Sequence, residues 1–329
     1  MARAVTAKDV AKAAGVSQAT VSYVINDHPD QKISAATRAR VLDAVADLGY
    51  TPSSAARALR KGSSDLVLLL LPDIPFGPVV AHLMEQLTDE LEPFGLMAVT
   101  RRIRAGTPVS SLWRELRPAA MVTIAPLSEQ DEREIHAAGI PVIGTALAPV
   151  SGVDMSSGPQ TAIGYMQVEH LAFMGHRRLG YAAPDDVRVA RFFGPRLAGA
   201  RAACLALGLD QPVVLEVPLD AGSAALAVDA WRQGLDPVTA VCAYNDDTAF
   251  ALLAGMHRRG LSAPGDLAVI GVDNIPLAAL ASPPLTTVDQ NLDPVAAQIA
   301  REITAALQGA PPPDTDAAEV ITLVVRASA

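Results

Sequence analysis

Eight short apolar runs, separated by longer segments of helical periodicity, dominate the chain after residue 65. Each run is four to six residues long and almost continuous in Val, Leu, Ile and Ala, which is typical of strands buried on both faces. The runs occupy residues 66–71, 96–99, 119–124, 140–143, 178–183, 213–217, 238–243 and 267–272. Amphipathic segments at 79–93, 161–174 and 196–207 lie between them, so the pattern is βαβ and predicts parallel sheets with helices on both sides. One sheet of eight or more strands fits this pattern, but two doubly wound lobes of about 100 to 130 residues fit the usual domain size better.

The first 26 residues have a different pattern, that of two short helices joined by a tight turn. Thr6 is placed to cap the first helix, Gly15 can take the positive φ that a sharp turn needs, and Ser17 is placed to cap the second. The second helix turns small polar groups and one tyrosine outward, at Gln18, Ala19, Ser22 and Tyr23. Because this format lays a recognition helix into the major groove, the segment predicts a DNA-reading head.

The charge of the chain is unevenly distributed. The net charge is −9, which by itself argues against nucleic acid as a partner. Residues 1–62, however, hold nine Lys and Arg against five Asp and Glu, a balance of +4, and the remainder carries 17 against 30, a balance of −13. A basic head on an acidic body concentrates attraction to phosphate at one end.

Two further segments follow the predicted head. Residues 34–50 have Val41, Leu42, Val45 and Leu48 at three- and four-residue steps, which predicts a third helix packed under the first two. Residues 53–60 are alanine-rich but shorter than the roughly 12 residues that an isolated helix needs. We therefore expect this hinge to be helical only when DNA and a partner subunit order it.

These elements, taken in order, resemble the lactose-repressor/galactose-repressor (LacI/GalR) family of bacterial transcription regulators. The match is carried by Asp9-Val10-Ala11, Ala14-Gly15-Val16-Ser17, Thr20-Val21-Ser22 and Asn26, by SAATRARVLDAVADLGY from Ser34, and by PSSAARAL from Pro52. The resemblance implies a helix-turn-helix headpiece at 1–51, a hinge helix at 52–63, and an α/β core like that of periplasmic binding proteins at 64–329. It places lobe 1 at about 64–160 and 292–319 and lobe 2 at about 161–291 and 320–329. Helix 294–308 would then return to the first lobe and strand 320–325 to the second.

The resemblance also implies which residues contact DNA. In the headpiece these are Thr6, Ser17, Gln18, Ala19, Thr20, Ser22, Tyr23 and Asn26, and in the hinge they are Ser53, Ala56, Arg57, Leu59 and Arg60. Leu59 matches the family leucine that wedges between base steps in the minor groove and bends the duplex, with an ordinary linker residue as the alternative. We expect Arg57 and Arg60 to touch phosphates, and Gln18, Ala19 and Tyr23 to reach base edges.

Ligands of doubly wound sheets bind beyond the carboxyl ends of the strands, which directs attention to the polar residues there. Four such residues match positions that bind effector in the resembling family: Arg196, Asn245, Asp273 and Gln290. A carboxylate, a guanidinium and two amides suit a polyol, so we expect a small hydroxylated effector and favour a sugar over a nucleobase or nucleoside. Asp73, Ile74 and Phe76 are predicted to form the opposite wall, and Phe192 or Phe193 is predicted to stack on the ligand ring.

Structural roles are the alternative for several of these side chains. Asp246 is expected to cap the helix that follows it, and Asp273 could do the same. Arg196 could serve as an ion-pair partner, and Phe192 could belong to the core. Many relatives carry an Asp-Asn pair before the first helix of the second lobe, where this chain has Gly158-Pro159. The ligand is therefore expected to be smaller, differently oriented or not a simple hexose.

The sequence does not point to catalysis. It has no Gly-rich phosphate loop, nucleophile elbow or Ser/His/Asp grouping, so we expect no enzyme. No metal or cofactor is expected, because adjacent groups at Asn245, Asp246 and Asp247 cannot all converge on one ion and no zinc spacing exists. Cys204 and Cys242 lie in apolar settings and are expected to be buried and reduced. With no signal-peptide pattern and no apolar run long enough to span a membrane, a cytoplasmic location is expected.

The combined expectation is a sequence-specific DNA-binding transcriptional regulator, a repressor, gated allosterically by its effector. A homodimer would present two recognition helices to the half-sites of a palindromic operator. The sequence ends three residues after Arg326, without the tetramerising tail of some relatives, which favours the dimer. A binding protein whose DNA head is vestigial is the main alternative, and the intact reading pattern argues against it.

Overall fold

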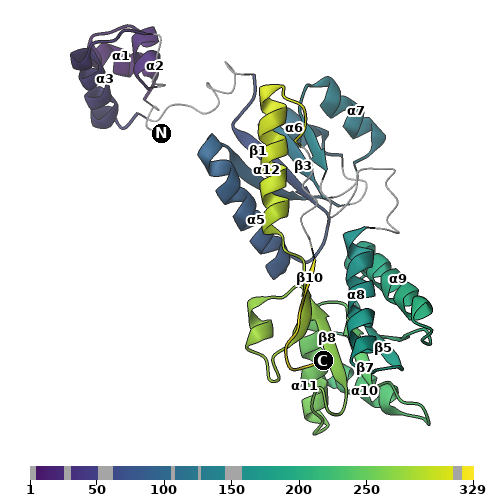
Figure 1. Ribbon diagram of the computed structural model, residues 1–329. Coiled ribbons are helices and arrows are strands. Elements are labelled where there is room, and N and C mark those ends of the chain that lie inside the picture. The colour runs from purple at the N-terminus through teal and green to yellow at the C-terminus, as the bar shows by residue number, and fades with distance from the viewer. Residues whose placement is uncertain are drawn as a thin grey trace. The chain divides into compact units, whose positions relative to one another are not determined.

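The computed structural model describes residues 5–25, 31–50, 62–104, 108–124, 127–144, 158–313 and 321–329 (Figure 1). The chain divides into two compact units, Met1–Ser64 and Asp65–Ala329. The hinge predicted at 53–60 lies outside the described residues.

The described part of the first unit contains helices α1 (Ala7–Ala14), α2 (Gln18–Ile25) and α3 (Ala35–Leu48). The turn between α1 and α2 forms as predicted, since Gly15 takes φ 65° and the Ser17 hydroxyl accepts a hydrogen bond from the Thr20 amide at 3.1 Å. The buried core has contributions from all three helices: Val10, Ala11, Ala14, Val21, Val24, Val41 and Ala44.

The prediction for the third helix is correct in its position and wrong for two of its apolar residues. Leu42 is 48% exposed and Leu48 is 37% exposed. The inward face of α3 is set by Val41 and Ala44. Leu42 lies about 100° around the helix from Val41, and Leu48 is the last helical residue, so neither packs into the small core.

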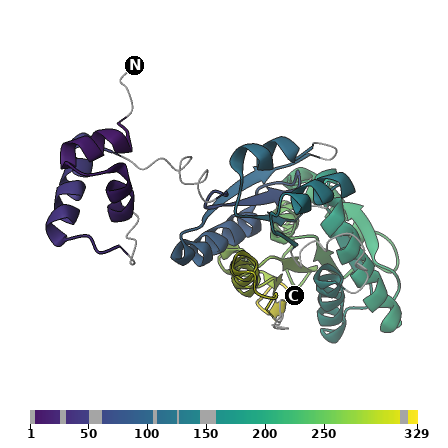
Figure 2. The same ribbon diagram turned by 90° about the horizontal axis from the view of Figure 1, so that it is seen from above.

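The second unit has two sheets, each in its own lobe. The first lobe has a parallel sheet in the order β2-β1-β3-β4, built from β1 (Leu66–Leu71), β2 (Met97–Arg102), β3 (Ala120–Thr123) and β4 (Val142–Gly144). On one face lie α5 (Pro78–Leu91) and α12 (Asp293–Gln308), and on the other α6 (Ser110–Leu116) and α7 (Glu129–Ala137) (Figures 1 and 2). Helix α12 thus returns to the first lobe from far along the chain.

The second lobe has a six-stranded sheet in the order β10-β9-β8-β7-β5-β6. Its strands are β5 (Leu179–Ala183), β6 (Val213–Glu216), β7 (Ala240–Ala243), β8 (Ala268–Val272), β9 (Thr286–Asp289) and β10 (Thr322–Val324). All neighbouring strands are parallel except β10, which runs antiparallel to β9. Helices α8 (Pro159–Phe173) and α9 (Ala190–Ala206) cover one face, and α10 (Ala221–Arg232) and α11 (Asp246–Arg258) cover the other.

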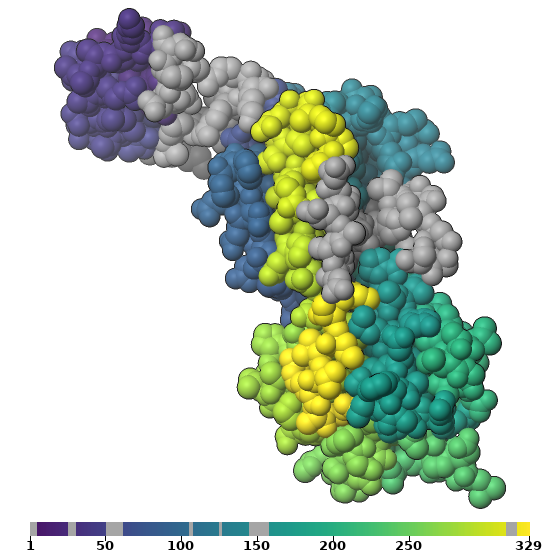
Figure 3. Space-filling view, viewed as in Figure 1, coloured from purple at the N-terminus to yellow at the C-terminus, as the bar shows by residue number. Residues whose placement is uncertain are grey.

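Every one of the eight predicted apolar runs overlaps a strand, although β2 and β4 extend beyond their runs, and the doubly wound fold class is confirmed. Strand β9 is not among the predicted runs, because Thr286 and Thr287 interrupt its apolar pattern. Both threonines are nevertheless fully buried, with their hydroxyls used in hydrogen bonds. In the space-filling view α12 crosses the first lobe, whereas the last residues of the chain lie on the second (Figure 3).

The two cysteines are buried and free, as predicted. Burial raises the pKa of the Cys204 thiol and, more strongly, that of Cys242. No helix in the described ranges combines the length and the apolarity needed to cross a membrane.

Candidate functional site

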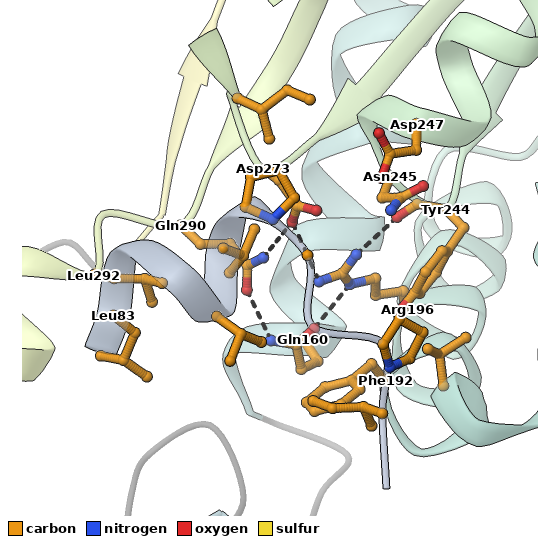
Figure 4. A pocket seen from close by; sticks show the side chains of 18 of the residues that line it. Leu83, Gln160, Phe192, Arg196, Tyr244, Asn245, Asp247, Asp273, Gln290 and Leu292 are labelled. Atoms are coloured by element: carbon orange, nitrogen blue, oxygen red, sulfur yellow. Dashed lines mark hydrogen bonds and ion pairs between the residues drawn. The ribbon is translucent and has the colours of Figure 1, made fainter. Parts of the chain in front are cut away.

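A cavity of about 160 Å³ lies between the two lobes, at the carboxyl ends of both sheets (Figure 4). The segment after β1 and the start of α5 form its first-lobe wall. The second lobe contributes the first turn of α8, the start of α9 and the residues that follow β7, β8 and β9. This is the position that the strand-end rule predicts for a ligand site.

The two walls differ sharply in chemistry. Among the described residues, the first-lobe wall presents no polar side chain and consists of Ile74, Pro75, Gly77, Pro78, Val79, Val80, Leu83 and Ile124. The second-lobe wall, with the segment after β9, supplies all the polar groups: Gln160, Arg196, Tyr244, Asn245, Asp247, Asp273 and Gln290. A ligand in this cavity meets hydrocarbon on one side and hydrogen-bonding groups on the other.

A closed hydrogen-bond network organises the polar wall (Figure 4). The Arg196 Nε donates to Gln160 Oε1 at 2.8 Å, and Gln160 Nε2 donates to Gln290 Oε1 at 3.0 Å. Gln290 Nε2 donates in turn to Asp273 Oδ1 at 2.5 Å, and this carboxylate oxygen lies 3.8 Å from Arg196 Nη2. The network therefore joins residues from α8, α9, the β8 end and the β9 end.

Arg196 is the central residue of this network and is only 4% exposed. Its Nη1 donates to the Tyr244 carbonyl oxygen at 2.7 Å, and its guanidinium lies 4.9 Å from the centroid of the Tyr244 ring. A buried guanidinium needs both charge compensation and satisfied donors. Here Asp273 supplies the charge, and Gln160 and Tyr244 accept the hydrogen bonds.

A glycine-mediated helix crossing brings Gln160 and Arg196 together. A Cβ on Gly164 of α8 would lie 1.8 Å from the Arg196 carbonyl oxygen, and a Cβ on Gly199 of α9 would lie 1.9 Å from the Thr161 carbonyl oxygen. Only glycine allows the two backbones to approach this closely. The start of α9 is thereby fixed against the start of α8, where Gln160 lies.

The carboxylates near the cavity titrate away from the ordinary aspartate value. Burial raises the pKa of Asp273 to about 6, against the opposing effects of Arg196 and of the Gln290 hydrogen bond. Burial also raises the pKa of Asp247, whose side chain faces the cavity. Asp273 remains largely ionised at neutral pH and can accept hydrogen bonds from ligand hydroxyl groups.

The expected cap on α11 is assigned to the wrong residue. Asn245, not Asp246, is the N-cap, since its Oδ1 accepts from the Thr248 amide at 3.0 Å. Asp246 is fully buried behind the cavity and accepts from the Thr287 hydroxyl at 2.6 Å and from the Ile275 amide at 2.9 Å. Burial raises the pKa of Asp246 to about 7. Asp246 thus ties α11 to β9 and to the turn after β8.

Six of the eight predicted effector contacts line the cavity: Ile74, Phe192, Arg196, Asn245, Asp273 and Gln290. The other two do not. Asp73 turns toward Arg102 at 3.3 Å and Arg104 at 3.7 Å, and Phe76 is 57% exposed. The short segment between β1 and α5 therefore lines the cavity through Ile74, Pro75 and Gly77.

The sequence reasoning missed three polar residues that line the cavity: Gln160, Tyr244 and Asp247. The Gly158-Pro159 pair predicts that the start of the second lobe offers the ligand no hydrogen-bonding side chain. Instead Pro159 begins α8 and Gln160, one residue later, points into the cavity with 4% exposure. The signal for it is the Gly-Pro helix start, which directs the next side chain toward the lobe boundary.

In the head, Thr6 lies at the start of α1 and Ser17 at the start of α2, and the other described contacts lie in α2. The Thr6 amide and hydroxyl both donate to Asp9 Oδ2, at 2.9 and 2.6 Å, and the Ser17 and Thr20 hydroxyls hydrogen-bond each other at 2.9 Å. Gln18 and Ala19 are exposed, while Ser22 and Tyr23 are half-buried. The remaining predicted contacts lie outside the described residues: Asn26, Ser53, Ala56, Arg57, Leu59 and Arg60.

Across the described ranges, no group of three or more His, Cys, Asp or Glu side chains is arranged to hold a metal ion. The chemistry available in the cavity is hydrogen bonding, charge pairing and apolar contact. This set serves recognition of a small molecule.

Comparison with known proteins agrees with both parts of the chain. Residues 6–53 match the family described as bacterial regulatory proteins, lacI family, and residues 168–329 match the periplasmic binding protein-like domain. The HTH-type transcriptional regulator DegA of Bacillus subtilis is 30% identical over 303 residues, which cover 89% of this chain and 88% of that protein. The ribose operon repressor of Escherichia coli is 32% identical over 300 residues, covering 88% of each.

Solved structures share the fold. The lac repressor dimer bound to operator and an anti-inducer superimposes with a TM-score of 0.78 over 99% of both chains, at 24% identity. A regulator in complex with cellobiose superimposes with a TM-score of 0.64 over 99% of this chain, at 25% identity.

Proposed function

Because the chain belongs to the LacI family of bacterial regulatory proteins, we propose that it represses transcription from a palindromic operator, which it binds as a homodimer. We further propose that a small ligand in the interlobe cavity changes its affinity for that operator. Like these relatives, the protein is a DNA-binding transcription regulator and not an enzyme.

The observation that carries the ligand proposal is the cavity itself. Four polar residues from separate elements form a network there, opposite an apolar wall: Gln160, Arg196, Asp273 and Gln290. Binding energy from both walls is available only when the lobes are close together. A ligand that favours this arrangement shifts the population toward it. If operator affinity differs between the two arrangements, ligand and operator affect each other's binding equally, whatever the sign.

The cavity chemistry favours a compact, single-ring ligand with hydroxyl groups. Asp273 can accept from ligand hydroxyls, and the Asn245 amide can donate while its oxygen caps α11. The C–H face of a sugar ring suits the wall formed by Val79, Val80 and Leu83. A sugar is therefore proposed ahead of a nucleobase or nucleoside, which would stack mainly on Phe192.

Selection of binding sites from random duplexes by the full-length protein tests the DNA part of the proposal. Enrichment of a palindrome with two half-sites is expected, and loss of binding is expected when residues 1–62 are removed. DNA binding that survives this removal would contradict the assignment of the head.

The ligand part is tested by measuring affinity for the selected duplex in the presence of single sugars, beginning with ribose, and of free nucleobases. A sugar that changes operator affinity should lose its effect in Arg196→Met, which removes the centre of the polar network. A nucleobase that acts while all sugars fail would replace the sugar in the proposal and leave the regulator intact.

A further inference from the structure

The turn that follows β8 has an unusual backbone. Asp273 takes φ 108° and Asn274 takes φ 50°, two consecutive non-glycine residues in a region that side chains disfavour. Among the residues that the structure describes, Arg117 is the only other non-glycine residue with positive φ. Strained backbone of this kind persists only where surrounding contacts impose it, and it concentrates at ligand-binding sites.

Backbone contacts fix the start and the end of this turn. The Asp273 amide donates to the Val288 carbonyl oxygen at 2.8 Å, and the Ile275 amide donates to Asp246 Oδ2 at 2.9 Å. These two bonds hold the residues on either side of Asn274. They leave open what stabilises Asn274 itself in the left-handed conformation.

The Asn274 side chain is held from both ends. Its Nδ2 donates to Asp289 Oδ2 at 2.8 Å, and its Oδ1 accepts from Arg326 Nη2 at 2.6 Å. Arg326 comes from the segment after β10, 52 residues away along the chain. The strained turn is therefore clamped between β9, through Asp289, and the C-terminal segment, through Arg326, while the Asn274 amide donates to the Thr287 hydroxyl at 3.4 Å.

Arg326 is itself firmly anchored. Its Nη1 donates to the Leu285 carbonyl oxygen at 2.7 Å, and its amide donates to the Thr286 hydroxyl at 3.0 Å. Two residues later the fully buried Ser328 donates from its hydroxyl to the Val269 carbonyl oxygen at 2.6 Å and accepts from the Thr286 amide at 2.9 Å. The guanidinium is thus presented to Asn274 from a rigid edge of the second sheet.

We propose that Arg326, which does not line the cavity, is a positioning residue for Asp273: through Asn274 it holds the strained turn that aims the Asp273 carboxylate at Gln290 and Arg196. Without this clamp the turn can relax to negative φ, and the carboxylate then leaves the polar wall. The inference rests on the proposed function in that the cavity is taken to bind the effector, but its test needs no effector.

The experiment is a titration of aspartate carboxyl groups by carbon-13 NMR in the full-length chain. In the unaltered protein Asp273 is expected to titrate at a pKa of about 6 and Asp246 at about 7, and the pKa of Asp247 is raised by burial as well. In Arg326→Gln the pKa of Asp273 should fall toward the ordinary value of 3.8, because the carboxylate becomes hydrated. The pKa of Asp246 should rise, because the Arg326 charge that lowers it has been removed.

Arg259→Gln is the matched control, since Arg259 makes a comparably well-formed pair with Asp229 in the same lobe, away from the cavity. It should leave both pKa values unchanged. A pKa of Asp273 that stays near 6 in a folded Arg326→Gln protein would overturn the proposal and reduce Arg326 to a stabilising residue.

Asn274→Ala decides the matter if Arg326→Gln does not fold. Alanine lacks the side-chain amide that Arg326 holds and, unlike glycine, does not relieve the strain of φ 50° at this position. The proposal expects the pKa of Asp273 to fall as in Arg326→Gln, and an unchanged pKa would contradict it. Operator selection is measured separately, so failure of the regulator proposal and failure of this one are distinguishable.

Discussion

Replacing Asp246 with asparagine isolates the free-energy cost of burying one carboxylate. The folded-state pKa of Asp246 is raised by burial to about 7, against 3.8 for an ordinary aspartate. Between these two values the native protein holds a proton that the unfolded chain has lost. The free energy of unfolding therefore falls as pH rises through this window. At about 1.4 kcal/mol for each pH unit, the loss approaches about 4 kcal/mol above neutral pH.

The Asp246→Asn substitution would remove this loss while preserving the shape of the site. The new side-chain oxygen can accept from the Ile275 amide, and the new amide group can donate to the Thr287 hydroxyl oxygen, which replaces both bonds of the carboxylate. Neutral hydrogen bonds are weaker than charged ones, by roughly 1 kcal/mol here. We expect Asp246→Asn to be more stable than the parent by about 2 to 4 kcal/mol at about pH 8, and to lie within about 1 kcal/mol of it near pH 4.

Urea unfolding from about pH 4 to about pH 8 measures this difference, with the fluorescence of Trp231 as the probe, since this tryptophan is buried in the same lobe. Asp273, whose pKa is raised as well, titrates in both proteins; because its charge also raises the pKa of Asp246, the difference between the two profiles includes this coupling. The exposed Asp185 provides a control, because Asp185→Asn removes one charge without changing a buried site. Parallel pH profiles for Asp246→Asn and the parent would refute the reasoning.

Four further outcomes are expected. Gly164→Ala should destabilise the protein by about 1 to 3 kcal/mol in urea unfolding, since its Cβ would meet the Arg196 carbonyl oxygen, whereas Gly194→Ala in the same pair of helices has open space and should not. Arg196→Met should abolish the response to ligand in operator-binding assays and lower stability by up to about 3 to 5 kcal/mol, because it leaves Asp273 buried without its cation. Tyr23→Ala should change the preferred sequence in site selection, and an unchanged site would remove Tyr23 from the base contacts. Leu59→Ala should reduce operator affinity and DNA bending, measured by gel mobility of permuted duplexes, and equal bending would contradict the wedge.

The predictions from sequence succeeded where local pattern and packing agree. Strands buried on both faces need apolar side chains at every position, so β1, β5 and β8 are visible as runs. The rule that ligands gather at strand ends, together with family resemblance, located Arg196 and Asp273. These features depend on short stretches of chain and on general topology.

The features that the sequence analysis failed to predict depend on contacts between residues that are far apart in the chain. Thr286 is buried in β9 because its hydroxyl bonds to the C-terminal Ala329 carbonyl, a partner that no local pattern reveals. Asp246 has the sequence position of a helix cap, and only the packing of the turn after β8 and of Thr287 makes it a buried bridge. Gln160 reaches the cavity because two glycines let α8 and α9 touch, which requires knowledge of both helices at once.

The return of α12 to the first lobe has a consequence for biosynthesis. The first sheet is complete once β4 has been made, yet one of its faces needs Val295, Ala296, Ile299 and Ile303 of α12 for its core. The helix-turn-helix unit ends at residue 64, about 230 residues before α12 begins, a delay on the order of ten to fifty seconds on a ribosome. A nascent chain thus carries a finished DNA-reading unit well before the lobe that follows it can close. For the same reason, exchanging this lobe between regulators requires a junction in the gene at each of the three crossings between the lobes, before α8, before α12 and before β10, and one more after residue 64.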